Sequence, residues 1–274
     1  MILNFDVKPA IVNFLILNFF SIFTISKSHH KSIMIKNKTN NSNIKSDSFL
    51  KKCFRILFKV AIWFFGVSVF LVLFFKWIPV PYTPLMLIRN IENNFAGKSM
   101  KCEHDWVPIE QISRTIQRAV IASEDDTFLR HSGFDFKALQ LAYKNNGTGK
   151  KIKGGSTISQ QTAKNVFLWQ GRSYFRKALE AYFTFLIELI WGKERIMEVY
   201  LNSIEMGDGV YGIQAASQFW YRKNAADLSK KEAAGIAAIL PNPRKFKASK
   251  SSDYIESRKG KIIKRMRYIG KLDY

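Results

Sequence analysis

The most prominent feature of the hydrophobic pattern is an uncharged apolar run over residues 60–75, VAIWFFGVSVFLVLFF, which lies between Lys59 and Lys76. A helix that spans a bilayer needs roughly 20 apolar residues. The apolar residues that flank the run supply the missing length if the two lysines extend their charged ends toward water. The pattern therefore predicts one transmembrane helix over residues 60–78, with a buried core helix as the alternative.

Basic residues are distributed unevenly around this run. Lys51, Lys52, Arg55 and Lys59 precede it, whereas only Lys76 follows it closely. Lys and Arg favour the cytoplasmic side of a membrane span. We therefore expect a basic cytoplasmic tail over residues 1–59 and an extracytoplasmic domain over residues 79–274.

A second apolar stretch covers residues 10–25, AIVNFLILNFFSIFTI, and contains two asparagines. It could be a first membrane span, or it could be upstream sequence translated from a misassigned start. We favour a start at Met34, because that residue opens a conventional basic tail. An intact-mass measurement that found residues before Met34 in the native protein would contradict this start.

Helical spacing of apolar residues dominates the remainder of the chain, without a long alternating strand pattern or an internal repeat. Helices are predicted in six segments: EQISRTIQRAVIASED, GGSTISQQTAKNVFLW, SYFRKALEAYFTFLIELIW, KERIMEVYLN, LSKKEAAGIAAIL and the basic tail SRKGKIIKRMRYIGK. The second of these starts with a glycine pair and a Ser/Thr cap, which is a typical helix beginning. The chain is therefore expected to be mainly α.

Charge narrows the class of partner. The formal net charge is +22, and the part after the apolar run holds 33 Lys and Arg against 19 Asp and Glu. A balance this basic indicates an anionic partner. Because the basic domain is expected outside the cytoplasm, nucleic acid is disfavoured, and a phosphate-bearing substrate or lipid headgroups are favoured. Cys53 and Cys102 lie on opposite sides of the predicted span and are not expected to pair.

Three adjacent acids, Glu124, Asp125 and Asp126, end the first predicted helix. Acids at a helix C-terminus oppose the helix dipole, so they form either a solvated turn or a group placed for chemistry. Glu124 is the candidate general base, because partial desolvation beside an apolar helix face makes a carboxylate a better proton acceptor. His131 could be a hydrogen-bond partner in this site or an ordinary turn residue.

Two later segments carry candidate anion-binding residues. Thr157, Gln161 and Lys164 form a polar stripe on a predicted helix whose N-terminus follows the glycine-rich segment 145–155. The stripe could also be a plain surface face, and no P-loop sequence supports a nucleotide site. Arg176 and Glu180, at i and i+4, could form an intrahelical ion pair or offer a planar guanidinium to a phosphate.

The order of the motifs resembles the peptidoglycan glycosyltransferase family, whose members polymerise the lipid-linked cell-wall disaccharide. E-D-x-x-F-x-x-H-x-G is followed by G-G-S-T-I-S-Q-Q-x-x-K-N, R-K-x-x-E and R-I-x-x-V-Y-L-N, within roughly residues 79–269. Since no transpeptidase domain follows, the sequence looks like the monofunctional biosynthetic transglycosylases of Gram-negative bacteria. The resemblance implies a mainly α, lysozyme-like, two-lobed domain on one N-terminal transmembrane helix. It also implies the bacterial inner membrane, with the N-terminus cytoplasmic and the catalytic domain periplasmic.

The resemblance assigns roles residue by residue. Glu124 matches the essential general base, and Glu180 matches a second catalytic carboxylate, whereas Asp126 falls at a variable position. The expected substrate-binding residues are those that match the remaining motif positions: Asp125, Phe128, His131, Thr157, Gln161, Lys164 and Arg176. No metal-ligand cluster is visible in the sequence, and the use of Mg or Mn is left open.

The implied reaction polymerises lipid II into β-1,4-linked glycan and releases undecaprenyl diphosphate, with Lys164 and Arg176 stabilising the leaving group and with no transpeptidase activity. Expected partners are lipid II, the growing lipid-linked glycan and cell-division or other cell-wall synthases, but no nucleic acid. A lytic muramidase and an inactive membrane scaffold are the rival hypotheses. Lengthening of lipid II rather than shortening of finished glycan excludes the lytic muramidase. Loss of polymerisation in Glu124→Gln excludes the inactive scaffold.

Overall fold

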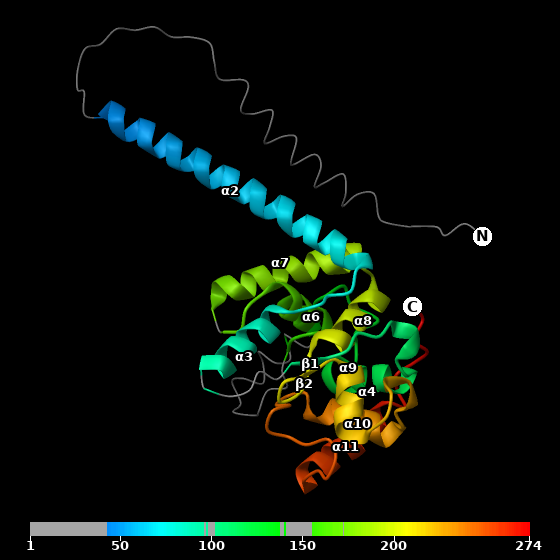
Figure 1. Ribbon diagram of the computed structural model, residues 1–274. Helices are drawn as coiled ribbons and strands as arrows, with labels where there is room; N and C mark the ends of the chain where they lie inside the picture. The colour runs from blue at the N-terminus through cyan, green and yellow to red at the C-terminus, as the bar shows by residue number, and fades with distance from the viewer. Residues whose placement is uncertain (1–42, 96, 98–101, 138–139, 141–154, 172) are drawn as a thin grey trace. The chain divides into compact units, whose positions relative to one another are not determined.

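A computed structural model describes residues 43–95, 97, 102–137, 140, 155–171 and 173–274 of the chain. Within these residues the structure has nine α-helices and three short strands, so the prediction of a mainly α chain with one N-terminal apolar helix is confirmed (Figure 1). The apolar stretch 10–25, the favoured start at Met34 and the glycine-rich residues 145–154 lie outside the described residues. The cytoplasmic placement of the tail stays a prediction.

The long helix α2 runs from Asn43 to Trp77. Among the described residues, its part Lys51–Trp77 is the one segment long and apolar enough to cross a membrane. The predicted span over residues 60–78 ends within one residue of the helix end, but the helix begins well before residue 60. Because Lys51 and Lys52 are followed by further apolar residues, helical geometry continues through them to the apolar run.

The second half of α2 is tied to the domain that follows it by three kinds of hydrogen bond. The hydroxyls of Ser68 and Tyr182 lie 2.6 Å apart. The indole Nε1 of Trp191 donates to the carbonyl of Val72 at 2.7 Å. The guanidinium of Arg195 donates to the Phe75 carbonyl at 2.9 Å, so polar contacts join the C-terminal end of the apolar helix to the helices that follow it.

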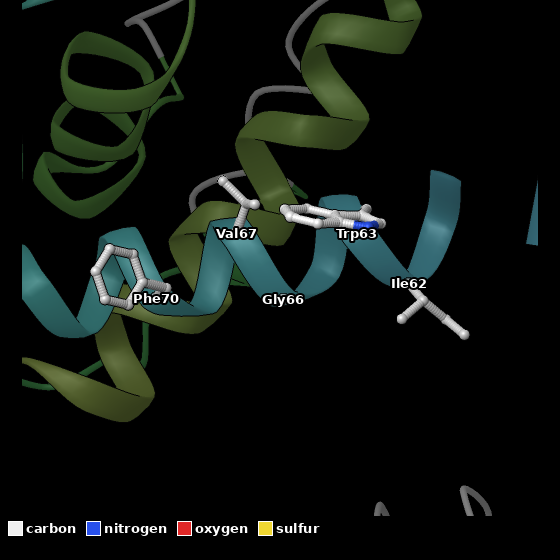
Figure 2. Close-up of a pocket in the computed structure, with 5 residues that line it drawn as sticks. All are labelled: Ile62, Trp63, Gly66, Val67 and Phe70. Carbon is white, nitrogen blue, oxygen red and sulfur yellow. The ribbon is translucent and has the colours of Figure 1, made fainter. Parts of the chain in front are cut away.

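Another side of α2 carries a shallow apolar pocket. Its lining residues belong to α2 itself and are Ile62, Trp63, Gly66, Val67 and Phe70 (Figure 2). Gly66 has no atom within 4 Å of the place where a Cβ would stand. The pocket contains no titratable group, so the chemistry of the protein has to lie elsewhere.

The remaining long helices pack in two groups. The first group comprises α6 (Ile158–Phe167), α7 (Tyr174–Ile190) and α8 (Lys193–Ser203), and the second comprises α4 (Arg114–Glu124), α10 (Lys230–Ile239) and α11 (Asp253–Arg265). All six overlap segments where helical periodicity predicts a helix, although α11 begins at Asp253, four residues before the predicted tail helix. Their buried faces form one continuous apolar core, and the two-lobed shape that the resemblance implies stays a prediction.

Local sequence explains where these helices begin. Thr157 caps α6, and Gln160 reaches back to the Thr157 backbone, so the two residues form a capping box. Ser229 and Glu232 form the same arrangement at the start of α10. Each box satisfies backbone N–H groups that a helix N-terminus otherwise leaves without a partner.

Shorter elements that the sequence pattern did not reveal complete the domain. They are α3 (Pro84–Phe95), α9 (Ile213–Tyr221), the 3-10 turns Ile109–Gln111 and Ala225–Asp227, and the strands β1 (Glu103–His104), β2 (Glu205–Gly207) and β3 (Val210–Tyr211). The strands form a sheet in the order β1-β3-β2, in which β1 runs parallel to β3 and β2 antiparallel to it. Strands of two or three residues are too short to show an alternating pattern.

Candidate active site

Glu124 is the last residue of α4, and its carboxylate is partly open, with 16% of the side chain exposed. The preceding residues Ile121 and Ala122 are buried, so the carboxylate stands at the edge of the apolar core. The helix ends here because Asp125 leaves helical geometry, with φ −159° and ψ 81°. This break turns Asp125 inward and leaves Glu124 at the surface of the site.

Both oxygens of Glu124 have polar neighbours, and these come from different helices. Ser123 donates its hydroxyl to Oε1 at 3.0 Å. Arg258 of α11 places Nη2 3.7 Å from the same Oε1 and donates to the Ser123 hydroxyl at 3.2 Å. From α6, Gln161 donates Nε2 to Oε2 at 3.3 Å. The carboxylate is therefore held where the two helix groups meet.

Asp125 is buried beneath this surface, with 3% of its side chain exposed. Its carboxylate accepts the backbone N–H of Ile158, the first residue of α6, at 3.0 Å. It also faces Nε2 of His131 at 2.9 Å. Because the N–H of Gly133 donates to Nδ1 of His131 at 3.1 Å, Nε2 carries the proton and donates to Asp125. Asp125 thus ties the end of α4 to the start of α6.

Phe128 and Thr157 lie in the same buried layer. Phe128 is fully buried and meets the ring of His131 edge to face, with ring centroids 6.3 Å apart. Thr157 accepts the N–H of Gln160 at 3.2 Å and donates its hydroxyl to the Gly133 carbonyl at 2.7 Å. The structure thus brings the first two motifs together, with Asp125, Phe128 and Thr157 behind the open surface. Direct contact of these three residues with a substrate stays a prediction.

A group of cations lies one turn along α6 from Gln161. Lys164, at i+3, has no hydrogen-bond or ion-pair partner among the described residues. Burial lowers the pKa of the Lys164 ammonium; Glu180 opposes that shift, whereas the cations Arg176 and Lys177 add to it. An amine that is partly removed from water and has no direct ion pair is a ready anion site.

The carboxylate of Glu180 organises two of these cations on α7. It is buried, with 4% of its side chain exposed, and pairs with Arg176, whose Nη1 lies 2.9 Å from Oε2, and with the Lys177 ammonium. The intrahelical ion pair that the sequence allows is therefore formed. Arg176 still has a buried Nε without a hydrogen-bond partner. With Lys164, the group contains three cations and one carboxylate.

Sequence reasoning missed four residues that contact this site: Ser123, Lys177, Tyr200 and Arg258. Arg258 belongs to the basic tail helix, to which the sequence assigns no site residue, and Tyr200 belongs to the fourth motif. Lys177 is visible in R-K-x-x-E as a charge beside Arg176, and Ser123 directly precedes Glu124. Only the folded arrangement shows that Arg258 and Tyr200 approach the first two motifs.

The carboxylates of the site do not fit a divalent metal well. Within the described ranges, no three His, Cys, Asp or Glu side chains are grouped so that they could hold one. Glu180 is already paired with two cations. No step proposed below uses a metal.

Comparison with known proteins identifies the family of the chain. The chain matches the Transglycosylase family over residues 92–267. It is 49% identical to a biosynthetic peptidoglycan transglycosylase of Pseudomonas syringae pv. syringae, over 82% of this chain and 95% of that protein. It is 55% identical to a protein of the same name from Caulobacter vibrioides, over 70% of this chain and 82% of that protein. The chain therefore belongs to the Transglycosylase family and is a peptidoglycan transglycosylase.

Proposed function

We propose that this protein polymerises lipid II into β-1,4-linked glycan strands and releases undecaprenyl diphosphate. The observation that carries the proposal is the placement of a partly open carboxylate, Glu124, beside Gln161 of α6, one turn from the unpaired ammonium of Lys164. A base beside Gln161 and a cation one turn further along α6 match a reaction in which a hydroxyl attacks while a phosphate leaves.

Glu124 is the general base of this reaction. Its carboxylate takes the proton from the 4-hydroxyl of the acceptor's N-acetylglucosamine, and that oxygen forms a bond to C1 of the donor's N-acetylmuramic acid. The bond from C1 to the diphosphate oxygen breaks, and its electron pair leaves with the diphosphate. Because attack and departure are on opposite faces of the sugar, an α-linked donor gives a β-1,4 product.

Lys164 and Arg176 stabilise the charge that grows on the leaving diphosphate. Lys164 is unpaired among the described residues, and Arg176 keeps a free N–H donor beside its bond to Glu180. Cations that are fixed before the reaction lower the barrier most, because they need no reorganisation as charge develops. Glu180, which sequence resemblance assigns to catalysis, holds Arg176 and Lys177 in this position.

Four residues behind the open surface hold Glu124 and the cation group in fixed positions relative to each other. They are Asp125, Phe128, His131 and Thr157. Asp125 bonds to the N-terminus of α6, so it fixes the distance between the end of α4 and the helix that carries Gln161 and Lys164. The burial of these side chains supports a holding role in addition to the substrate contact expected from sequence.

The apolar helix α2 supports a location at the inner membrane, with the catalytic domain in the periplasm. Both substrates are lipid-linked, so an anchor confines enzyme and substrates to one surface and raises their encounter rate. Within this proposal the protein has no transpeptidase activity, and its partners are lipid II, the growing glycan and cell-division or other cell-wall synthases.

The proposal is tested by incubating the purified full-length protein with fluorescent lipid II, and separately with finished glycan strands. We expect lengthening of lipid II into products that a muramidase digests, and no shortening of finished strands. A protein that shortens strands and leaves lipid II unchanged is a lytic enzyme, and a protein that does neither is a scaffold. Parallel reactions with Mg, with Mn and with a chelator determine the metal dependence.

A further inference from the structure

The amide of Gln161 can help Glu124 in only one of its two orientations. An ionised carboxylate accepts hydrogen bonds and cannot donate them. In the structure the Nε2 end of Gln161 donates to Glu124 Oε2 at 3.3 Å. A half-turn of the amide would place Oε1 against the carboxylate, and the two oxygens would repel each other. Something must therefore hold the amide in the donating orientation.

Tyr200 of α8 is placed to do so. Its side chain is fully buried, and its hydroxyl lies 3.1 Å from Oε1 of Gln161. Burial raises the pKa of the Tyr200 hydroxyl well above its ordinary value, and the charges of Glu124 and Asp125 raise it further. The hydroxyl therefore keeps its proton and is a donor at any pH at which the enzyme works. It donates to Oε1, which turns Nε2 toward Glu124.

The other oxygen of Glu124 does not depend on this contact. Oε1 is held by Ser123 and Arg258, whereas Gln161 is the hydrogen-bond donor to Oε2 within the described part of the chain. Loss of the Gln161 donor would leave Oε2 without its hydrogen bond, so the position of this oxygen would no longer be fixed. The orientation of the carboxylate then rests on one oxygen alone.

We propose that Tyr200 is a positioning residue of the reaction: its hydroxyl fixes the amide of Gln161, and the amide in turn aligns the carboxylate of Glu124. Tyr200 has no exposed atoms that could touch a substrate. It acts only through Gln161. This inference rests on the proposed role of Glu124 as general base.

Tyr200→Phe tests the proposal with the removal of a single buried oxygen. Polymerisation of lipid II by the full-length variant should fall about tenfold, because the amide that Tyr200 no longer fixes loses its hydrogen bond to the charged Glu124 carboxylate. The acidic limb of kcat/KM against pH should also move to higher pH, because a carboxylate that loses a donor ionises less readily. Tyr221→Phe is the matched control, since Tyr221 also has a part-buried hydroxyl with one acceptor, the Ala248 carbonyl at 2.8 Å. The Tyr221→Phe variant should keep the acidic limb of kcat/KM at the wild-type pH.

A double-mutant cycle separates positioning from simple support of the core. The variants are Tyr200→Phe, Gln161→Met and the combination of both. If Tyr200 acts through Gln161, Tyr200→Phe lowers the rate in the wild-type background and has no further effect on Gln161→Met. An equal loss in both backgrounds, or no loss in either, overturns the proposal.

A second variant keeps the test decisive if Tyr200→Phe unfolds. 4-Aminophenylalanine at position 200 keeps an N–H donor at the same place and should retain the wild-type acidic limb; a limb displaced to higher pH contradicts the inference. The proposed function fails in a distinguishable way. In that case the wild-type protein itself does not polymerise lipid II, whereas failure of the present inference leaves wild-type polymerisation intact and gives Tyr200→Phe the same effect, or no effect, with and without Gln161→Met.

Discussion

Asp125→Asn should destabilise the protein far more than its conservative chemistry suggests. Asp125 has 3% of its side chain exposed and accepts hydrogen bonds from two buried donors, the Ile158 N–H at 3.0 Å and His131 Nε2 at 2.9 Å. His131 Nε2 lies within 3.0 Å of both carboxylate oxygens, whereas an asparagine presents one oxygen and one NH2 group, so in either orientation the His131 N–H faces a donor. At least one hydrogen bond to a charged group is lost, and a buried polar group remains without a partner.

The loss of one such bond costs roughly 1.5–3 kcal/mol of folding free energy. For a folded unit of about 200 residues, each kcal/mol lowers Tm by roughly 2–4 °C. The expected fall in apparent Tm is therefore roughly 3–12 °C. Polymerisation should also fall, because the end of α4 and the start of α6 are no longer fixed to each other.

The assay is thermal unfolding of the full-length protein in one detergent at one scan rate, so that apparent Tm values are comparable. Asp126→Asn is the matched control, because Asp126 is adjacent and exposed and its change should cost no more than about 0.5 kcal/mol. An Asp125→Asn variant that unfolds at the wild-type temperature would refute the role of Asp125 as the link between the two helix groups.

Further predictions concern Lys164 of the cation group, the backbone at Gly212 and the hydrogen bond of Trp191. Lys164→Met should raise apparent Tm while it removes polymerisation, since the fold holds an ammonium whose pKa burial lowers; a variant that is less stable, or fully active, contradicts this. The Lys164 charge is lost as pH rises through its lowered pKa, so Lys164→Arg should shift the alkaline limb of activity to higher pH if it is active. Gly212→Ala should cost about 2 kcal/mol or more, because φ is +78° and the new Cβ would stand 2.7 Å from the Asn202 carbonyl oxygen; denaturant unfolding measures the loss. Trp191→Phe, which removes the bond to the Val72 carbonyl, should cost about 1 kcal/mol, and an unchanged unfolding free energy would show that this bond contributes nothing.

Helices with strong local signals could be predicted from the sequence. α6 has a capping box and a buried face that includes Ile158, Thr162 and Val166, and the same face appears in the spacing of its residues. The elements that could not be predicted have weak local signals. α9 is short and has Gly212 as its N-cap residue, which supplies no capping side chain, and the strands depend on neighbours rather than on their own pattern.

The site was predictable only in part, because its residues come from both helix groups. Motif order identified Glu124, Gln161 and Lys164. The burial of Asp125 and Thr157 could not be read from their polar side chains, since burial depends on the hydrogen bonds that the fold supplies. Arg258 reaches Ser123 and Glu124 only because α11 packs beside α4.

The most direct test of the account compares Glu124→Gln with Asp126→Asn in the polymerisation of fluorescent lipid II. The two substitutions are of the same kind and lie two residues apart. Glu124→Gln removes the proton acceptor and should abolish polymerisation while the protein stays folded, whereas Asp126→Asn should remain near the wild-type rate. Polymerisation by Glu124→Gln at close to the wild-type rate would contradict the assignment of Glu124 as the general base.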